Sequence, residues 1–133
     1  GKAAGLFGPG NHGSTFGGNP LAATAALTTI SVMEEDGLLD NAARIGALIR
    51  QLFGEALAGV EGVVDIRGHG LMIGIELDRP CGELVTKGLA QGLLINVTSD
   101  TIIRLLPPLI FSDSDARELV ERTAPLIKDF LAA

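Results

Sequence analysis

Residues 63–77 read VVDIRGHGLMIGIEL, two apolar runs separated by a short glycine-containing segment. The runs Val63–Arg67 and Leu71–Leu77 are rich in β-branched residues, which favour extended backbone on a pleated surface. Gly68, His69 and Gly70 lie between them, and glycine is the usual residue of a tight turn. The stretch therefore predicts a β-hairpin whose loop is formed by residues 68–70.

Two more strands are expected further along the chain. Residues 94–98 and 101–105 are short apolar runs that are close enough in sequence to pair with each other. Pro107 and Pro108 follow and cannot donate to a sheet ladder, so pairing should end before them. These strands and the hairpin together predict a mainly antiparallel sheet.

Helices are expected on both sides of these strands in the sequence. Asn19 before Pro20 fits an N-cap followed by the first helical position, so a helix should run over residues 19–35 after a glycine-rich loop over 1–18. Apolar residues at helical spacing predict an amphipathic helix over 38–58, and residues 82–92 fit a short helix. A last helix should begin after Ser112 or Asp113, with Pro125 as a misfit inside it. The predicted fold class is α+β, with helices packed on one face of the sheet.

Composition restricts the function classes. The 133 residues carry a formal net charge of −6, and 47% of them are hydrophobic, which is enough to build a core. Clustered lysines and arginines are absent, which argues against a nucleic-acid or membrane-surface partner. No apolar run is long enough to predict a membrane span. The single Cys81 cannot form an internal disulfide and fits a reducing compartment, so a cytoplasmic location is expected.

The glycine-rich segment 12–22, HGSTFGGNPLA, is the strongest candidate for ligand binding. Its glycines allow the backbone to approach a ligand closely, Ser14 and Thr15 offer hydroxyl donors, and a helix N-terminus follows. These are features of a phosphate site, although the same residue types also serve as plain helix capping. Two histidines, His12 and His69, are too few and too isolated to predict a metal site.

Three segments in order carry a family resemblance. HGSTFGGNPLA at 12–22, RGHGLMIGIEL at 67–77 and IRLLPPLI at 103–110 resemble the signatures of the class III pyridoxal-phosphate aminotransferases. The resemblance covers essentially the whole chain, although residues 37–62 and 112–133 match only in helical character. It implies that residues 1–30 end a cofactor-binding large domain and begin a connecting helix. Residues 31–133 would form the small C-terminal α+β domain of a fold-type I enzyme.

The resemblance also implies roles for three residues of the loop. In the family, the Ser-Thr pair reaches across a homodimer interface to the phosphate of the neighbouring subunit's pyridoxal 5'-phosphate, which assigns this role to Ser14 and Thr15. Phe16 would line the same boundary on the substrate side. The alternatives are a self-contained turn in which the hydroxyls cap the helix at residue 19, and a core position for Phe16.

Arg104 is the predicted substrate anchor. Between Ile103 and Leu105 at the end of an apolar strand, an arginine is costly unless it meets an anion. In the family this arginine grips a substrate carboxylate, for which a planar guanidinium is suited. The alternative is an arginine paired with a local acid such as Asp100.

The catalytic lysine of the family is not among the residues of this chain. Lys2, Lys87 and Lys128 are its only lysines, and none lies in the family's Schiff-base motif, so no catalytic residue is assigned. The chain thus looks like the C-terminal third of an enzyme and is expected to be inactive alone.

The resemblance favours members that transfer an amino group between N-acetylornithine and 2-oxoglutarate in arginine biosynthesis. Sister enzymes that act on ornithine, succinylornithine or 4-aminobutyrate share all three motifs. A different class of function also stays open, a naturally short, non-catalytic chain that uses this domain for dimerisation or for interaction.

Overall fold

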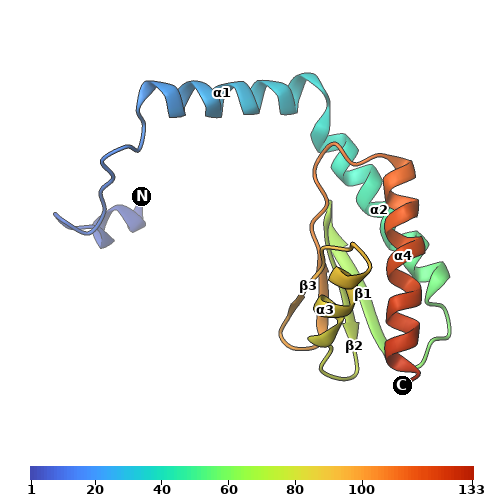
Figure 1. Cartoon of the computed structure of the whole chain (residues 1–133). Coiled ribbons are helices and arrows are strands. Elements are labelled where there is room, and N and C mark those ends of the chain that lie inside the picture. The colour runs from blue at the N-terminus through green and yellow to red at the C-terminus, as the bar shows by residue number, and fades with distance from the viewer. The chain divides into compact units, whose positions relative to one another are not determined.

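The computed structural model describes residues 1–133, which form two compact units, Gly1–Asp36 and Gly37–Ala133 (Figure 1). The predicted division after residue 30 falls inside a helix, whereas the observed division follows the end of that helix. Whether the first unit belongs to a cofactor-binding domain stays a prediction.

The first unit is a loop followed by one long helix. A short 3-10 helix, η1 (Lys2–Leu6), interrupts the loop predicted over residues 1–18, and α1 (Pro20–Glu35) follows. The predicted N-cap is confirmed, because the Asn19 side chain accepts a hydrogen bond from the Ala22 N–H at 3.1 Å. Neither helix contains a buried residue, and Leu21 and Leu27 of α1 are 81% and 66% exposed.

The second unit contains a four-stranded antiparallel sheet. Its strands are β1 (Val63–His69), β2 (Met72–Leu77), β3 (Asn96–Thr98) and β4 (Ile102–Leu105), in the spatial order β1-β2-β4-β3. All four predicted strands are therefore present, and the antiparallel sheet is confirmed.

The hairpin loop is shorter than predicted. Gly68 and His69 belong to β1, His69 pairs with Met72, and the turn consists of Gly70 and Leu71. Gly70 has a φ of +50°, as the first position of a two-residue hairpin turn requires. Position 68 lies in the strand and needs a glycine for another reason. A Cβ there would overlap the backbone of Met72. The prediction of a loop over residues 68–70 was wrong because it took a close-approach glycine for a turn glycine.

Three helices cover one face of the sheet (Figure 1). They are α2 (Leu38–Ala56), α3 (Glu83–Ala90) and α4 (Asp113–Leu131). The helix α2 packs on β1, β2 and α4, while α3 packs on α4 and β3. The predicted α+β class, with helices on one face, is confirmed. No helix in the structure has the length and apolar composition that crossing a membrane requires.

The core lies between the helices and this face of the sheet. Its fully buried side chains include the following residues from the helices and the two central strands: Ile45, Ile49, Phe53, Ile73, Ile75, Ile103 and Ile127. Because side chains alternate along a strand, burying these isoleucines of β2 and β4 turns the residues between them outward. The opposite face of the sheet therefore carries the polar side chains of the hairpin and of β4.

The last helix begins as predicted. The Ser112 hydroxyl accepts from the Asp115 N–H at 3.2 Å, and the Asp115 carboxylate accepts from the Ser112 N–H at 2.9 Å, which together form a capping box. Pro125 lies inside α4 without ending it.

Candidate functional site

The helix-free face of the sheet carries a transverse row of residues that includes two arginines. In the ladder, Gly74 of β2 is opposite both Arg67 of β1 and Arg104 of β4, and Asn96 of β3 is opposite Arg104. Gly74 places no side chain between the two guanidinium groups. The row therefore presents two cations with an open strip of backbone between them.

A hollow of about 350 Å³ lies over this row. Its lining residues come from all four strands, and they are Arg67, Gly68, His69, Met72, Ile73, Gly74, Thr98, Ile102 and Arg104. The lining contains no carboxylate, while it contains two arginines and a histidine. Of the two arginines, only Arg104 has no ion-pair partner, because Arg67 is bound to Asp65 and Glu76.

Arg104 is exposed and has no hydrogen-bond or ion-pair partner within the chain. The alternative of a pair with Asp100 is wrong, because the structure has no ion pair between the two side chains. The expectation that burial makes this arginine costly was also wrong. Ile103 and Leu105 point into the core, so the alternation of the strand turns Arg104 to the solvent face.

Arg67 is occupied, in contrast to Arg104. Its Nη1 donates to Glu76 Oε2 at 2.5 Å and to Asp65 Oδ2 at 2.9 Å. Hydrogen bonding to Glu76 first, and to Asp65 second, raises the pKa of Arg67 above its ordinary value. The two arginines of the row thus differ, because Arg67 is bound to two carboxylates whereas the guanidinium of Arg104 has no partner in this chain.

Sequence reasoning missed Arg67, Asp65 and Glu76 as members of this face. The signal was available in the alternation of the hairpin, in which Arg67 and Glu76 fall on outward positions. The pairs Arg67–Gly74 and Asp65–Glu76 follow the register set by the two-residue turn at Gly70 and Leu71, which the sequence prediction misplaced. The bulge between Val63 and Asp65 lies beyond these pairs and shifts only the pairing of Val63.

The loop that contains Ser14, Thr15 and Phe16 belongs to the first unit and is exposed throughout. The Ser14 hydroxyl oxygen accepts from the Gly17 N–H at 2.8 Å, which is the local turn expected as an alternative. The capping itself is done by Asn19, whose side chain also donates to the Phe16 carbonyl at 2.5 Å. Phe16 is 80% exposed and belongs to no core of this chain.

The donor set of this loop fits an anion. Ser14 uses its oxygen as an acceptor and keeps its hydroxyl proton for donation, and the Thr15 hydroxyl has no partner. No acidic residue occurs before Glu34, so no carboxylate of the loop would repel a phosphate. The residues present therefore fit a phosphate-bearing cofactor.

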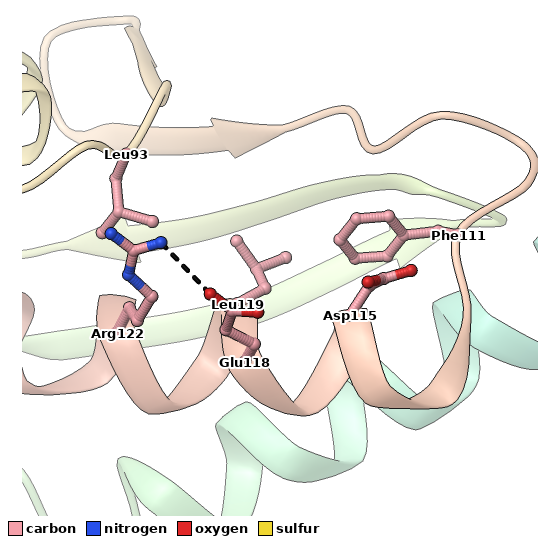
Figure 2. A pocket seen from close by; sticks show the side chains of 6 residues that line it. All are labelled: Leu93, Phe111, Asp115, Glu118, Leu119 and Arg122. Atoms are coloured by element: carbon pink, nitrogen blue, oxygen red, sulfur yellow. Dashed lines mark hydrogen bonds and ion pairs between the residues drawn. The ribbon is translucent and has the colours of Figure 1, made fainter.

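A second, smaller hollow of about 200 Å³ lies beside α4 (Figure 2). Leu93, Phe111 and Leu119 form its apolar part, while Arg122 is already bound to Glu118 at 3.3 Å and to the Gln91 carbonyl at 2.5 Å. The bond to Gln91 joins α4 to the end of α3, while the bond to Glu118 lies within α4. The polar groups here therefore serve the helices themselves.

Other reactive groups are not assembled into a site. Cys81 is buried, and burial raises the pKa of its thiol, which keeps it protonated. No three His, Cys, Asp or Glu side chains meet in an arrangement that could hold a metal ion.

Comparisons with known proteins agree with this architecture. The model of the family Aminotransferase class-III matches residues 2–127. The chain is 55% identical to acetylornithine aminotransferase 1 of Bordetella parapertussis, over 99% of this chain and 34% of that protein. It thus spans about a third of the length of the curated relatives it matches.

Solved structures share the fold. The ornithine aminotransferase of Toxoplasma gondii superposes with a TM-score of 0.82 at 34% identity, over 96% of this chain and 31% of that chain. The acetylornithine aminotransferase of Elizabethkingia anophelis gives a TM-score of 0.81 at 32% identity, over 96% of this chain and 34% of that one. The match to the family model over residues 2–127 shows that this chain is a member of the class III aminotransferases.

Proposed function

We propose that this chain is the C-terminal part of an acetylornithine aminotransferase. The complete enzyme would transfer an amino group between N-acetylornithine and 2-oxoglutarate in arginine biosynthesis, with pyridoxal 5'-phosphate as its cofactor. The observation that carries the proposal is the unpaired guanidinium of Arg104, held over an open hollow at the motif that matches the family. Relatives that are 55% and 51% identical to this chain are acetylornithine aminotransferases, which supports N-acetylornithine as the amino donor.

The role proposed for Arg104 is to bind and orient a substrate carboxylate. A guanidinium can hold both oxygens of a carboxylate in one plane, which fixes the direction of the substrate as well as its position. Ile103 and Leu105 anchor the strand in the core on either side, so the guanidinium is carried by a rigid element.

The role proposed for Ser14 and Thr15 is to hold the cofactor phosphate of the neighbouring subunit in a homodimer, with Phe16 at the same boundary. Hydroxyl donors to a phosphate form charge-assisted hydrogen bonds. The cofactor, when bound, supplies an electron sink for the amino transfer. The residues of this chain supply the anchors, and the 133 residues alone are expected to show no transaminase activity.

The test is the variant Arg104→Lys in the complete protein. Lysine keeps the charge and loses the planar pair of donors, so KM for 2-oxoglutarate should rise about tenfold or more, as loss of a charge-assisted hydrogen bond does. Arg79→Lys, at an arginine bound to Asp78 at 2.7 Å outside the hollow, is the control. Unchanged kinetics of Arg104→Lys would refute the assignment of Arg104. A substrate panel with the four amino donors tests the choice of substrate separately.

A further inference from the structure

Gly74 is a glycine that the backbone of this fold does not require. It lies inside β2, a strand that is paired on both sides, where glycine weakens a sheet relative to a β-branched residue. Its φ is not positive, so its conformation is open to any residue. The ladder is also regular at this position, because the only irregularity between β1 and β2 lies between residues 63 and 65. Gly74 therefore marks neither a turn nor a bulge.

The space around Gly74 distinguishes it from Gly68 in the same hairpin. A Cβ at Gly68 would overlap the backbone of Met72, which cannot move aside. Apart from its chain neighbours, a Cβ at Gly74 would meet one atom within 4 Å, the Cγ2 of Ile102 at 3.2 Å. Ile102 borders the hollow over this face and can turn about χ1 into it. A methyl group at residue 74 is therefore compatible with the fold, so what the missing side chain provides is the space above the strand.

This space lies between a cation and apolar side chains. Gly74 is directly opposite Arg104 in the ladder, and the hollow of about 350 Å³ is lined by both. Met72, the outward residue before Gly74, is 59% exposed, and Ile102 borders the same hollow from β4. Because Gly74 is paired on both sides, its bare backbone offers van der Waals contact rather than a free N–H. These surroundings match a carboxylate on a short, unbranched hydrocarbon chain.

We propose that Gly74 is a specificity-determining residue, on whose bare backbone the hydrocarbon chain of the substrate lies while Arg104 binds the substrate carboxylate. The inference rests on the proposed function, in which Arg104 is the substrate anchor. It concerns the substrate-bound enzyme only and holds whatever Arg104 contacts before the substrate arrives. Any side chain at residue 74 would raise the floor of the hollow and push the substrate away from the guanidinium.

Two other reasons for a glycine at this position make different predictions. If another segment of the complete protein lay against Gly74, an added methyl group would destabilise the complete protein without any ligand. If Gly74 had no contact beyond this chain, the methyl group would weaken neither binding nor stability. Only the proposed role predicts weaker binding together with undiminished stability.

The experiment compares G74A and G74V with the wild type in the complete protein. Glutarate serves as an unreactive dicarboxylate, and its Kd is measured by isothermal titration calorimetry. In G74A the Kd should rise about tenfold or more, as one extra carbon does in a fitted pocket, and in G74V it should rise further because the side chain is larger. The urea midpoint of G74A without glutarate should equal or exceed that of the wild type, because alanine loses less conformational entropy on folding than glycine.

The controls separate this inference from the proposed function. G54A adds the same methyl group in α2, where no atom lies within 4 Å of it, and should leave the Kd unchanged. R104M tests the anchor itself, and glutarate binding that survives R104M would refute the proposed function. With that anchor established, an unchanged Kd in both G74A and G74V overturns the role of Gly74.

A further pair of variants removes the contact with Ile102 from the test. Leucine at residue 102 has no branch at Cβ, so I102L leaves room for the methyl group of G74A. The Kd of G74A/I102L should again exceed that of I102L about tenfold or more. A lower urea midpoint of G74A/I102L than of I102L without glutarate would show that another segment lies against Gly74, and would overturn the proposal.

Discussion

The backbone of Gly46, in the middle of α2, lies directly against the carbonyl group of Gly70, at the turn between β1 and β2. A Cβ at residue 46 would overlap the Gly70 carbonyl, so this glycine permits the closest approach between the helix layer and the hairpin. The hairpin carries Arg67 and Glu76, so the seating of α2 also determines where the candidate site lies above the core.

Gly46→Ala should therefore destabilise the second unit. The methyl group must push α2 away from the turn, an overpacking effect that costs about 1–3 kcal/mol. Gly54→Ala in the same helix is the matched control, because no atom lies within 4 Å of the added Cβ. The control should gain about 0.5–1 kcal/mol from helix propensity. Urea unfolding measures both, and equal midpoints for the two variants would contradict the close approach.

Asn41→Leu tests the link between α2 and the segment after β4. The Asn41 side chain donates to the Leu109 carbonyl at 2.7 Å and to the Phe111 carbonyl at 3.0 Å. Leucine leaves these carbonyls without their donor, which should cost about 1–3 kcal/mol and speed amide exchange in residues 106–111. Gln51→Leu removes an exposed bond to Glu55 in the same helix and should change stability by less than about 0.5 kcal/mol. A loss of equal size in both variants would refute the link.

The capping box of α4 should make stability depend on pH in acid. Hydrogen bonds from Ser112 lower the pKa of Asp115 below its ordinary value. The unfolded chain then binds a proton more readily than the folded chain. The contribution of Asp115 is therefore complete above the ordinary aspartate pKa of about 4 and is lost as pH falls through the folded-state value.

The measurement compares wild type and Asp115→Asn by urea unfolding at several pH values. The difference in stability should be largest near neutrality and shrink as the pH falls below about 4. Asp129→Asn is the control, because it removes a carboxylate of the same helix that has no bond to Ser112. It measures how much stability changes with pH when a carboxylate outside the capping box is lost. A difference between wild type and Asp115→Asn that grows in acid would contradict the assigned role of the box.

Several of these features could be predicted from the sequence because their causes are local. Asn19 and Ser112 were identified as helix starts, since a cap depends on residues within one turn of it. The four strands followed from composition and alternation. Gly68 misled the prediction of the hairpin loop. A glycine is needed at this position because the backbone of Met72 on the neighbouring strand leaves no room for a Cβ, and no local sequence pattern contains that contact.

The candidate site was predictable in part. Arg104 was found through its motif, but its neighbours in the row depend on the strand order β1-β2-β4-β3, which brings segments distant in sequence together. The physical argument given for Arg104 also needed correction. An arginine between two apolar residues indicates burial in a helix or a fully covered strand, whereas in a half-covered sheet it indicates the open face.

Hydrogen exchange should distinguish the two units. Residues 1–18 include no buried side chain, and α1 has no tertiary burial to add to its own hydrogen bonds. Amides there should exchange at the earliest times, while those of Ile75 and Ile103 in the central strands exchange last. Protection of residues 1–18 equal to that of the sheet would contradict this, and repeating the measurement at lower concentration would reveal whether self-association covers them.

Under the role proposed for Arg104, the alternation of β4 would give the core an influence on substrate selectivity. Ile103 and Leu105 face inward on either side of Arg104, so the packing beneath the sheet sets the height and the tilt of the guanidinium above it. In the proposed role, a guanidinium held in this way would bind a carboxylate only at one distance from the reacting end of a ligand. Trimming either neighbour would loosen this hold before it unfolds the domain, and the first sign of a weakened core would be a broader range of accepted chain lengths.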